Sequence, residues 1–244
     1  MNAIETRGLT RRFGAVEAVR NLNLTVPEGE LFALLGVTGA GKTNAIRMLC
    51  GLLPPTSGDA LLLGRSVTRE AAAARALVNV SPQETAVAGG LSVRENLRFI
   101  AGIYGMDRRR AADAAEEMLE RMGLTEVAGQ RAKTLSGGWQ RRLSIAMGLI
   151  SRPKLLFLDE PTLGLDVLAR RELWRVIEGL RREMTIVLTT HYLEEAEALA
   201  DRVGIMAKGV LKALGTPAQL VSQSGSANFE DAFVALAAGE EARL

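Results

Sequence analysis

Residues 31–43 read LFALLGVTGAGKT. The first five are apolar, which predicts a buried strand of a parallel sheet. The next eight match the phosphate-binding pattern GxxxxGK(S/T) without a mismatch. Apolar residues at helical spacing continue to Gly51, so a helix is expected to begin where this loop ends. The helix N-terminus would place roughly half a positive charge beside a bound triphosphate. The order of strand, glycine-rich loop and helix therefore indicates a nucleotide site.

Each part of this loop has an expected role. Three glycines would let backbone N–H groups turn toward phosphate oxygens, because no Cβ blocks the approach. Lys42 would reach the β- and γ-phosphates, and the Thr43 hydroxyl would hold Mg²⁺. A glycine-rich turn that binds nothing is the alternative, but the strand, loop and helix signals agree. We call residues 36–44 the phosphate-binding loop; its members are Gly36, Val37, Thr38, Gly39, Ala40, Gly41, Lys42, Thr43 and Asn44.

Composition limits the class of protein. The 244 residues can bury a core in one domain, or in one domain with an inserted lobe. Lysine and arginine number 30 against 28 acidic residues, so no broad positive field for nucleic acid is expected. The arginine pairs 11–12, 141–142 and 181–182 are expected to be solvated. Cys50 alone excludes an intrachain disulfide and suits a reducing compartment.

We expect neither a secretory signal nor a membrane-spanning segment from this sequence. The first residues lack the apolar stretch of a secretory signal. No apolar run approaches the roughly 20 residues that cross a bilayer. We therefore expect any membrane role to go through a partner chain.

Polar residues follow three further apolar runs, where parallel strands gather ligands at their carboxyl ends. Asp159 and Glu160 follow the run 155–158 and should point to opposite faces. Asp159 fits a direct or indirect Mg²⁺ ligand, and Glu160 a group that orients or deprotonates water. Such an acidic pair can also be a simple helix cap or turn.

Gln83 follows a short strand at 77–80 and is a candidate for contacting Mg²⁺ or the attacking water, or it is simply solvated. His191, the only histidine, ends a strand at 185–190. It could donate a hydrogen bond to the γ-phosphate. A satisfied structural histidine is the alternative.

Residues 86–152 change to helix after helix. Ser92 with Glu95 forms a capping-box pattern, and Asp107 precedes a second helix. Residues 136–138, Ser-Gly-Gly, open a third helix and form a second anion-binding nest. One nucleotide does not need two nests from one chain, but the second could complete a site on another copy, head to tail. A helix start without a ligand is the alternative.

The remaining segments complete an α/β arrangement. Strands are expected at 4–9 and 18–26, with Phe13 in the turn between them. Phe13 could stack on adenine or be a plain hydrophobic anchor. Asp166 can cap a helix that runs toward residue 183. We expect residues 1–85 and 153–222 to form the ATP-binding core, 86–152 a helical lobe, and 223–244 a tail with a linker at 222–226 and a helix at 228–237.

The motifs occur in the order found in ABC-transporter ATPases, and the sequence resembles such a nucleotide-binding domain over nearly its whole length. The set comprises Phe13, the phosphate-binding loop (Walker A), Gln83, 135–138, 155–160 (Walker B), 164–166 and His191. The resemblance implies a P-loop NTPase (RecA-like) core with an antiparallel β subdomain and an inserted helical subdomain. It also implies ATP and Mg²⁺ as cofactors and an ATP-sandwich dimer.

In that dimer Ser136, Gly137 and Gly138 would bind the γ-phosphate held by the opposite subunit. The resemblance gives the adenine-stacking role to Phe13, the Q-loop role to Gln83, the D-loop role to Asp166 and the switch role to His191. Departures are Val37 and Thr38 for the common Pro-Asn pair, Asn44 for a hydroxyl residue, Trp139 for a flexible polar residue, and a short tail.

Residues 190–197 and 229–233 resemble the branch that exports drugs, polysaccharides or lipids. The implied partners are an integral membrane transporter subunit and a second ATP-binding subunit, at the cytoplasmic face of the cell membrane, without nucleic acid. The segment 83–104 is the expected docking surface, with Leu91, Val93, Phe99 and Ile103. A soluble ABC ATPase acting on ribosomes or DNA and a non-catalytic ATP-binding scaffold are the alternatives. Intact Glu160 and His191 argue against the scaffold.

Overall fold

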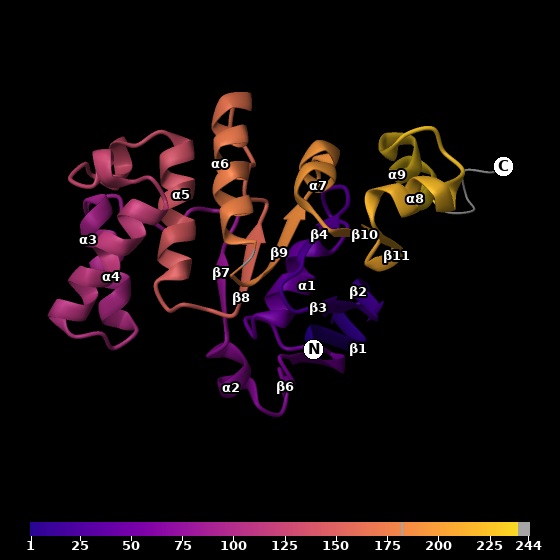
Figure 1. The fold of residues 1–244 in the computed structure, drawn as a ribbon. Coiled ribbons are helices and arrows are strands. Elements are labelled where there is room, and N and C mark those ends of the chain that lie inside the picture. Colours follow the sequence, from indigo (N-terminus) through magenta and orange to yellow (C-terminus); the bar gives the residue numbers. More distant parts are fainter. Residues whose placement is uncertain (182, 239–244) are drawn as a thin grey trace.

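The computed structural model describes residues 1–181 and 183–238. Within them, the larger sheet has six strands in the order β11-β10-β4-β9-β8-β7 (Figure 1). All neighbouring pairs are parallel except β10 and β11. The strands are β4 (Leu31–Leu35), β7 (Val78–Ser81), β8 (Leu155–Asp159), β9 (Thr185–Thr190), β10 (Arg202–Ala207) and β11 (Val210–Gly215).

The second sheet is antiparallel and has the order β2-β1-β5-β6, with β3 paired to β1. Its first strand runs on to Phe13, so the expected strand at 4–9 was too short. The expected strand at 18–26 is divided, because β2 pairs with residues 9–13 of β1 and β3 pairs with residues 2–5. Leu22, Leu24 and Val26 are nevertheless buried as their alternation predicts. The strands are β1 (Asn2–Phe13), β2 (Val16–Leu22), β3 (Thr25–Pro27), β5 (Ser57–Leu62) and β6 (Arg65–Ser66).

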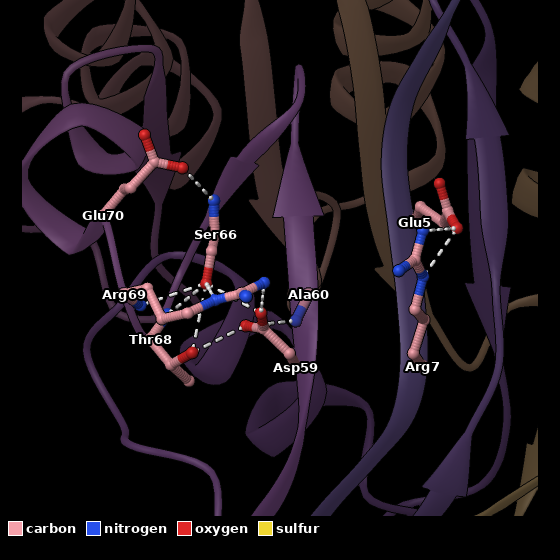
Figure 2. Close-up of polar contacts among 8 residues, drawn as sticks. All are labelled: Glu5, Arg7, Asp59, Ala60, Ser66, Thr68, Arg69 and Glu70. Carbon is pink, nitrogen blue, oxygen red and sulfur yellow. Dashed lines mark hydrogen bonds and ion pairs between the residues drawn. The ribbon is translucent and has the colours of Figure 1, made fainter.

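A polar network closes the β5–β6 hairpin around Asp59 (Figure 2). The carboxylate of Asp59 accepts hydrogen bonds from Ser66 Oγ at 2.7 Å, Thr68 Oγ1 at 2.9 Å and Arg69 Nη2 at 3.0 Å. Partial burial alone would raise the pKa of Asp59. The hydrogen bonds from these three side chains and from the Ala60 amide lower it by more, so the pKa lies below its ordinary value. The hairpin is therefore held by a carboxylate that stays ionised at neutral pH.

Helices cover both faces of the parallel sheet, and α3, α4 and α5 gather at one end of the molecule (Figure 1). The capping box of Ser92 with Glu95 and the Asp107 cap are present as predicted. The helices are α1 (Lys42–Leu49), α2 (Ala71–Arg75), α3 (Val93–Ile103), α4 (Arg108–Arg121), α5 (Gly137–Leu149), α6 (Val167–Leu180), α7 (Leu193–Leu199), α8 (Pro217–Ser224) and α9 (Phe229–Ala238), with 3₁₀ turns at Thr125–Val127 and Ala132–Thr134.

Two helix boundaries differ from the sequence expectation. α6 ends at Leu180 rather than near residue 183. The expected linker at 222–226 is largely wrong, because α8 extends through Ser224 before Gly225 turns the chain with a φ of +68°. A helix signal was present: Thr216 caps α8, Gln219 completes the capping box, and a proline occupies the first turn.

The core is divided by the sheet, and β4 shows the division most clearly. Leu31, Ala33 and Leu35 join the cluster that contains the helical lobe, α6 and α7. Phe32 and Leu34 join the other cluster, which contains α1 and the antiparallel sheet. All five side chains are buried, as expected for a strand covered on both faces. This double burial fixes the carboxyl end of β4, from which the phosphate-binding loop begins.

Three arginine pairs were expected to be solvated. Arg12 is exposed, but Arg11 donates from Nη1 to the Pro54 carbonyl at 2.8 Å. Arg181 is half-buried and bonds to Asp201, and Arg182 lies outside the described residues. The prediction that Arg141 and Arg142 are solvated is wrong, and their contacts are described with the active site.

Candidate active site

The phosphate-binding loop joins β4 to α1, and two of its glycines are required by their surroundings. A Cβ on Gly36 would lie 2.2 Å from the Met206 carbonyl oxygen of β10. A Cβ on Gly41 would lie 2.3 Å from the Ala18 carbonyl oxygen, and the φ of Gly41 is +103°. Gly39 has open space around it but a φ of +83°. Backbone conformation and close packing therefore both demand glycine here.

This loop borders a cleft of about 190 Å³ at the carboxyl ends of the strands. The cleft brings the loop together with Gln83, Glu160 and His191, the three residues predicted to act on water or the γ-phosphate. Leu163 completes the wall. The loop residues that line the cleft are Thr38, Gly39, Ala40, Gly41, Lys42, Thr43 and Asn44, whereas Gly36 and the exposed Val37 are outside it.

Lys42, the first residue of α1, is held inside this cleft. Its side chain is buried, and Nζ donates to the Gly36 carbonyl at 2.6 Å. Nζ also lies 3.1 Å from Oε1 of Glu160. The ammonium is thus aimed back over the loop, where the β- and γ-phosphates of a nucleotide would lie.

Glu160 is the next carboxylate of the cleft. Its other oxygen, Oε2, lies 2.7 Å from Nδ1 of His191. The Glu160 carboxylate is therefore held between a lysine and a histidine and is almost fully buried. This arrangement can orient a water molecule and accept its proton, because the carboxylate has a fixed direction and a polar neighbour on each side.

Thr43 and Asp159 are predicted metal ligands, and they meet beside the cleft. The Thr43 hydroxyl lies 3.2 Å from Oδ1 of Asp159 and donates to it. Both groups offer oxygen, and oxygen ligands are what Mg²⁺ prefers. The donor set therefore fits Mg²⁺ bound together with substrate phosphates. The side chain of Gln83, the third predicted metal contact, is exposed at the cleft wall.

Besides Gly36, Val37 and Asp159, five more predicted site residues are outside the cleft lining. Ser136, Gly137 and Gly138 stand at the N-terminus of α5, and Asp166 caps α6 by accepting from the Ala169 amide at 2.9 Å. Phe13, at the end of β1, is 46% exposed with the Arg11 guanidinium 4.5 Å from its ring centre. These residues therefore do not line the cleft formed by the phosphate-binding loop of their own chain.

Arg141 was not among the site residues predicted from the sequence. The prediction that its side chain is solvated was wrong. The Arg141 side chain is 4% exposed. Nη1 donates to the Pro82 carbonyl at 2.7 Å and Nη2 to the Gln83 carbonyl at 2.6 Å. Burial lowers the pKa of this guanidinium, although Asp159 and Glu195 oppose the shift. Helical spacing could have found it, because residue 141 precedes the buried Ile145 by one turn.

Arg142 is not solvated either. Its Nη2 pairs with Glu172 of α6 at 2.6 Å, and its guanidinium lies 4.9 Å from the ring centre of Trp139. Trp139 packs against the core cluster of the helical lobe, as its apolar ring favours. The start of α5 is thus anchored on both sides.

We expect Arg141→Met to loosen the backbone that carries Gln83. The carbonyls of Pro82 and Gln83 lose their donors, and each lost bond is worth about 1 kcal/mol. Amide hydrogen exchange in residues 83–86 should therefore accelerate by up to about 30-fold through local opening. Arg142→Met is the matched control, since the Arg142 guanidinium contacts Glu172 and Trp139 rather than the carbonyls of Pro82 and Gln83. Equal exchange at residues 83–86 in both variants would contradict the assignment.

Comparison with known proteins agrees with this geometry. A family model described as "ABC transporter" matches residues 19–163. The chain belongs to the ABC transporter family. Its mixed α/β architecture is that of an ATP-binding subunit of this family, as predicted from the motif order.

Curated relatives share much of the sequence. The probable multidrug ABC transporter ATP-binding protein YbhF of Escherichia coli K12 is 40% identical over 96% of this chain but only 41% of its own length. The chain thus spans less than half of that relative. The daunorubicin/doxorubicin resistance ATP-binding protein DrrA of Streptomyces peucetius is 41% identical over 92% of this chain and 68% of its own.

A solved structure supports the same fold. It is described as an ATP-binding subunit of an ABC transporter, and it aligns with a TM-score of 0.83 at 27% identity. The alignment covers 96% of this chain and 99% of that one. In the described part of this chain, no helix combines the length and apolar character needed to cross a membrane.

Proposed function

We propose that this chain hydrolyses ATP to power an exporter whose transport pathway is formed by a membrane-embedded partner. The observation that carries the proposal is the Glu160 carboxylate, held between Lys42 and His191 at a glycine-rich phosphate cleft. A base, a phosphate-directed cation and a polar switch residue are the groups that nucleotide hydrolysis needs.

The residue roles follow from position. Lys42 and the loop amides bind the phosphates, while Thr43 and Asp159 hold Mg²⁺. Bound Mg²⁺ would neutralise the charge that develops on the phosphate oxygens. Glu160 accepts the proton of the attacking water, and His191 directs that water and the γ-phosphate. Gln83 lies on the cleft wall, and we assign it to contacting Mg²⁺ or the attacking water.

We propose that a second ATP-binding subunit completes each site, in a homodimer or a heterodimer. Ser136 and Gly137 are exposed at the N-terminus of α5, outside the cleft of their own chain. Within the described residues, the Ser136 hydroxyl makes no capping bond to α5, so it is available to a partner's nucleotide. Asp166 would lie at the same interface, and Phe13 would stack on adenine.

The domain division remains that expected from the sequence: 1–85 with 153–222 as the core, 86–152 as the helical lobe and 223–244 as the tail. The gathering of α3, α4 and α5 at one end of the molecule supports it, with α5 also packing against β7 and β8 of the core. The tail boundary falls inside α8, and residues 239–244 lie outside the described chain.

We further propose attachment at the cytoplasmic face of the membrane, with residues 83–104 as the docking surface. Phe99 and Ile103 are exposed on α3 and support this use. Val93, also expected there, is fully buried and cannot contribute. The names of the relatives favour drug-like organic cargo, and the near balance of charge gives no reason to expect nucleic acid.

Mixing two inactive chains tests the shared site. Ser136→Glu places a negative charge against the partner's phosphates, and Lys42→Met disables the chain's own loop. Each variant alone should lose at least about tenfold in turnover. Their mixed dimer contains one site with an intact loop and an intact Ser136, so turnover should reappear on mixing.

Tagged pull-down with MgATP shows whether mixed pairs form. Mixed pairs that regain no turnover would overturn the shared-site proposal. Full turnover by Ser136→Glu alone would do the same.

A further inference from the structure

Thr189 connects the two acidic residues at the end of β8. It lies in strand β9, which is the neighbour of β8 in the sheet (Figure 1). Its side chain is completely buried. Its hydroxyl donates to Oδ1 of Asp159 at 2.5 Å and accepts from the backbone amide of Glu160 at 2.9 Å. A single hydroxyl group therefore contacts the proposed metal ligand and the backbone of the proposed base.

The backbone of Glu160 needs such support. Its φ of +48° belongs to the left-handed region that residues other than glycine seldom adopt. The Glu160 amide also donates to the Thr189 carbonyl at 3.1 Å. Thr189 thus holds this amide from two oxygens, and the turn it stabilises directs the Glu160 side chain to Lys42 and His191.

The carboxylate of Asp159 is held by the same hydroxyl. Its Oδ1 receives one hydrogen bond from Thr189 and another from Thr43 at 3.2 Å. Both hydroxyls donate to Oδ1, so the other carboxylate oxygen, Oδ2, can face a bound metal ion. Fixing a carboxylate ligand in this way is a common means of tuning a metal site.

Strand packing alone does not require a hydroxyl at this position. The neighbours Val187 and Leu188 are apolar and equally buried, and valine would fill the same volume. Thr190 differs, because its hydroxyl accepts from the Tyr192 amide in a local turn. The Thr189 hydroxyl therefore serves the active site, through Asp159 and Glu160, and is not needed for packing of the strand.

We propose that Thr189 is a positioning residue that sets both Asp159 and Glu160 through its hydroxyl. This inference rests on the proposed function of those two carboxylates. It predicts that turnover and the dependence of nucleotide binding on Mg²⁺ change together when the hydroxyl is removed, while Mg²⁺-free nucleotide binding does not.

The experiment compares four variants of the full chain. Thr189→Val keeps the shape and removes the hydroxyl, Thr189→Ala removes it without adding a methyl group, and Thr189→Ser keeps it. Thr185→Val is the matched control, because Thr185 is buried in the same strand but accepts from the Gly29 amide at its opposite end.

We expect kcat to fall about 10- to 100-fold in Thr189→Val and Thr189→Ala. The Mg²⁺ concentration that half-saturates binding of a non-hydrolysable ATP analogue should rise by a similar factor, whereas affinity without Mg²⁺ should stay within about twofold. Thr189→Ser and Thr185→Val should resemble the wild type in both measurements.

Several results would overturn the proposal. Wild-type kcat in Thr189→Val would do so, as would equal losses in Thr189→Val and Thr189→Ser. An unchanged Mg²⁺ midpoint, or the same kcat loss in Thr185→Val, would reduce Thr189 to a structural residue. If Thr189→Val is active while Glu160→Gln is not, only this inference fails; if both are fully active, the proposed function fails as well.

Discussion

We expect the Glu160→Gln chain to bind ATP and to hydrolyse it about 10²- to 10⁴-fold more slowly than the wild type. Glutamine has nearly the same shape but cannot accept a proton from water. It also releases Lys42 from the ion pair of 3.1 Å, so the ammonium remains available to the phosphates. Affinity for ATP should therefore be retained while the chemical step is lost.

A consequence is the accumulation of ATP-bound dimer. We expect ATP to close the proposed dimer and hydrolysis to reopen it, so a chain that cannot hydrolyse should remain paired. Size-exclusion chromatography with MgATP measures the dimer, and phosphate release under saturating ATP measures turnover. Hydrolysis by Glu160→Gln at the parental rate would refute the assignment of Glu160 as the base.

Glu195→Gln is the matched control for this experiment. Glu195 is another buried glutamate, in α7, and its Oε1 accepts from Nε1 of Trp174 at 3.0 Å. Burial raises the pKa of its carboxyl, which favours the neutral form that glutamine resembles. Glu195 does not line the cleft, so its amide variant should keep turnover near the wild-type rate.

The location of the site could be predicted because apolar runs in the sequence mark the strands, and the residues that follow them mark the strand ends. Gln83, Glu160 and His191 each follow an apolar run, and parallel strands deliver such residues to one edge of the sheet. Their convergence on the phosphate-binding loop follows from that rule. The loop itself was predictable because its glycines and its lysine have fixed spacing.

Hydrogen-bond partners were not predictable in the same way. A threonine within a core strand reads as one more β-branched residue, so Thr189 gave no signal. Arg141 was judged by its charge, although its place one turn before Ile145 on α5 indicated burial. Sequence periodicity predicts which face of a helix or strand is buried. It does not predict which atom a side chain on that face will hydrogen-bond.

The strand boundaries in the antiparallel sheet failed for a related reason. β2 ends at Leu22, one residue after Asn21 with its left-handed φ, although the apolar alternation continues into β3. Alternation describes which side chains are buried, and it remained correct through β3. It does not report where hydrogen bonding passes from one part of β1 to another.

Replacing Lys42 by methionine should weaken ATP binding by roughly 30- to 1000-fold, because the phosphates lose a buried cation worth about 2–4 kcal/mol. The same change should lower the free energy of unfolding, since the almost fully buried Glu160 loses one of its two polar neighbours. Breaking such a pair costs about 3 kcal/mol. Calorimetric titration measures the first effect and urea unfolding the second.

The double variant separates the two roles of Lys42. Adding Glu160→Gln to Lys42→Met removes the unpaired carboxylate, so we expect the free energy of unfolding to recover by more than half. ATP affinity should stay low, because glutamine at position 160 supplies no cation for the phosphates. Recovery of stability without recovery of binding would show that Lys42 serves the fold through Glu160 and the nucleotide through its charge. If the losses of unfolding free energy from the two substitutions simply add in the double variant, the Lys42–Glu160 ion pair contributes nothing to stability. The effect of Lys42 on the fold would then be independent of Glu160.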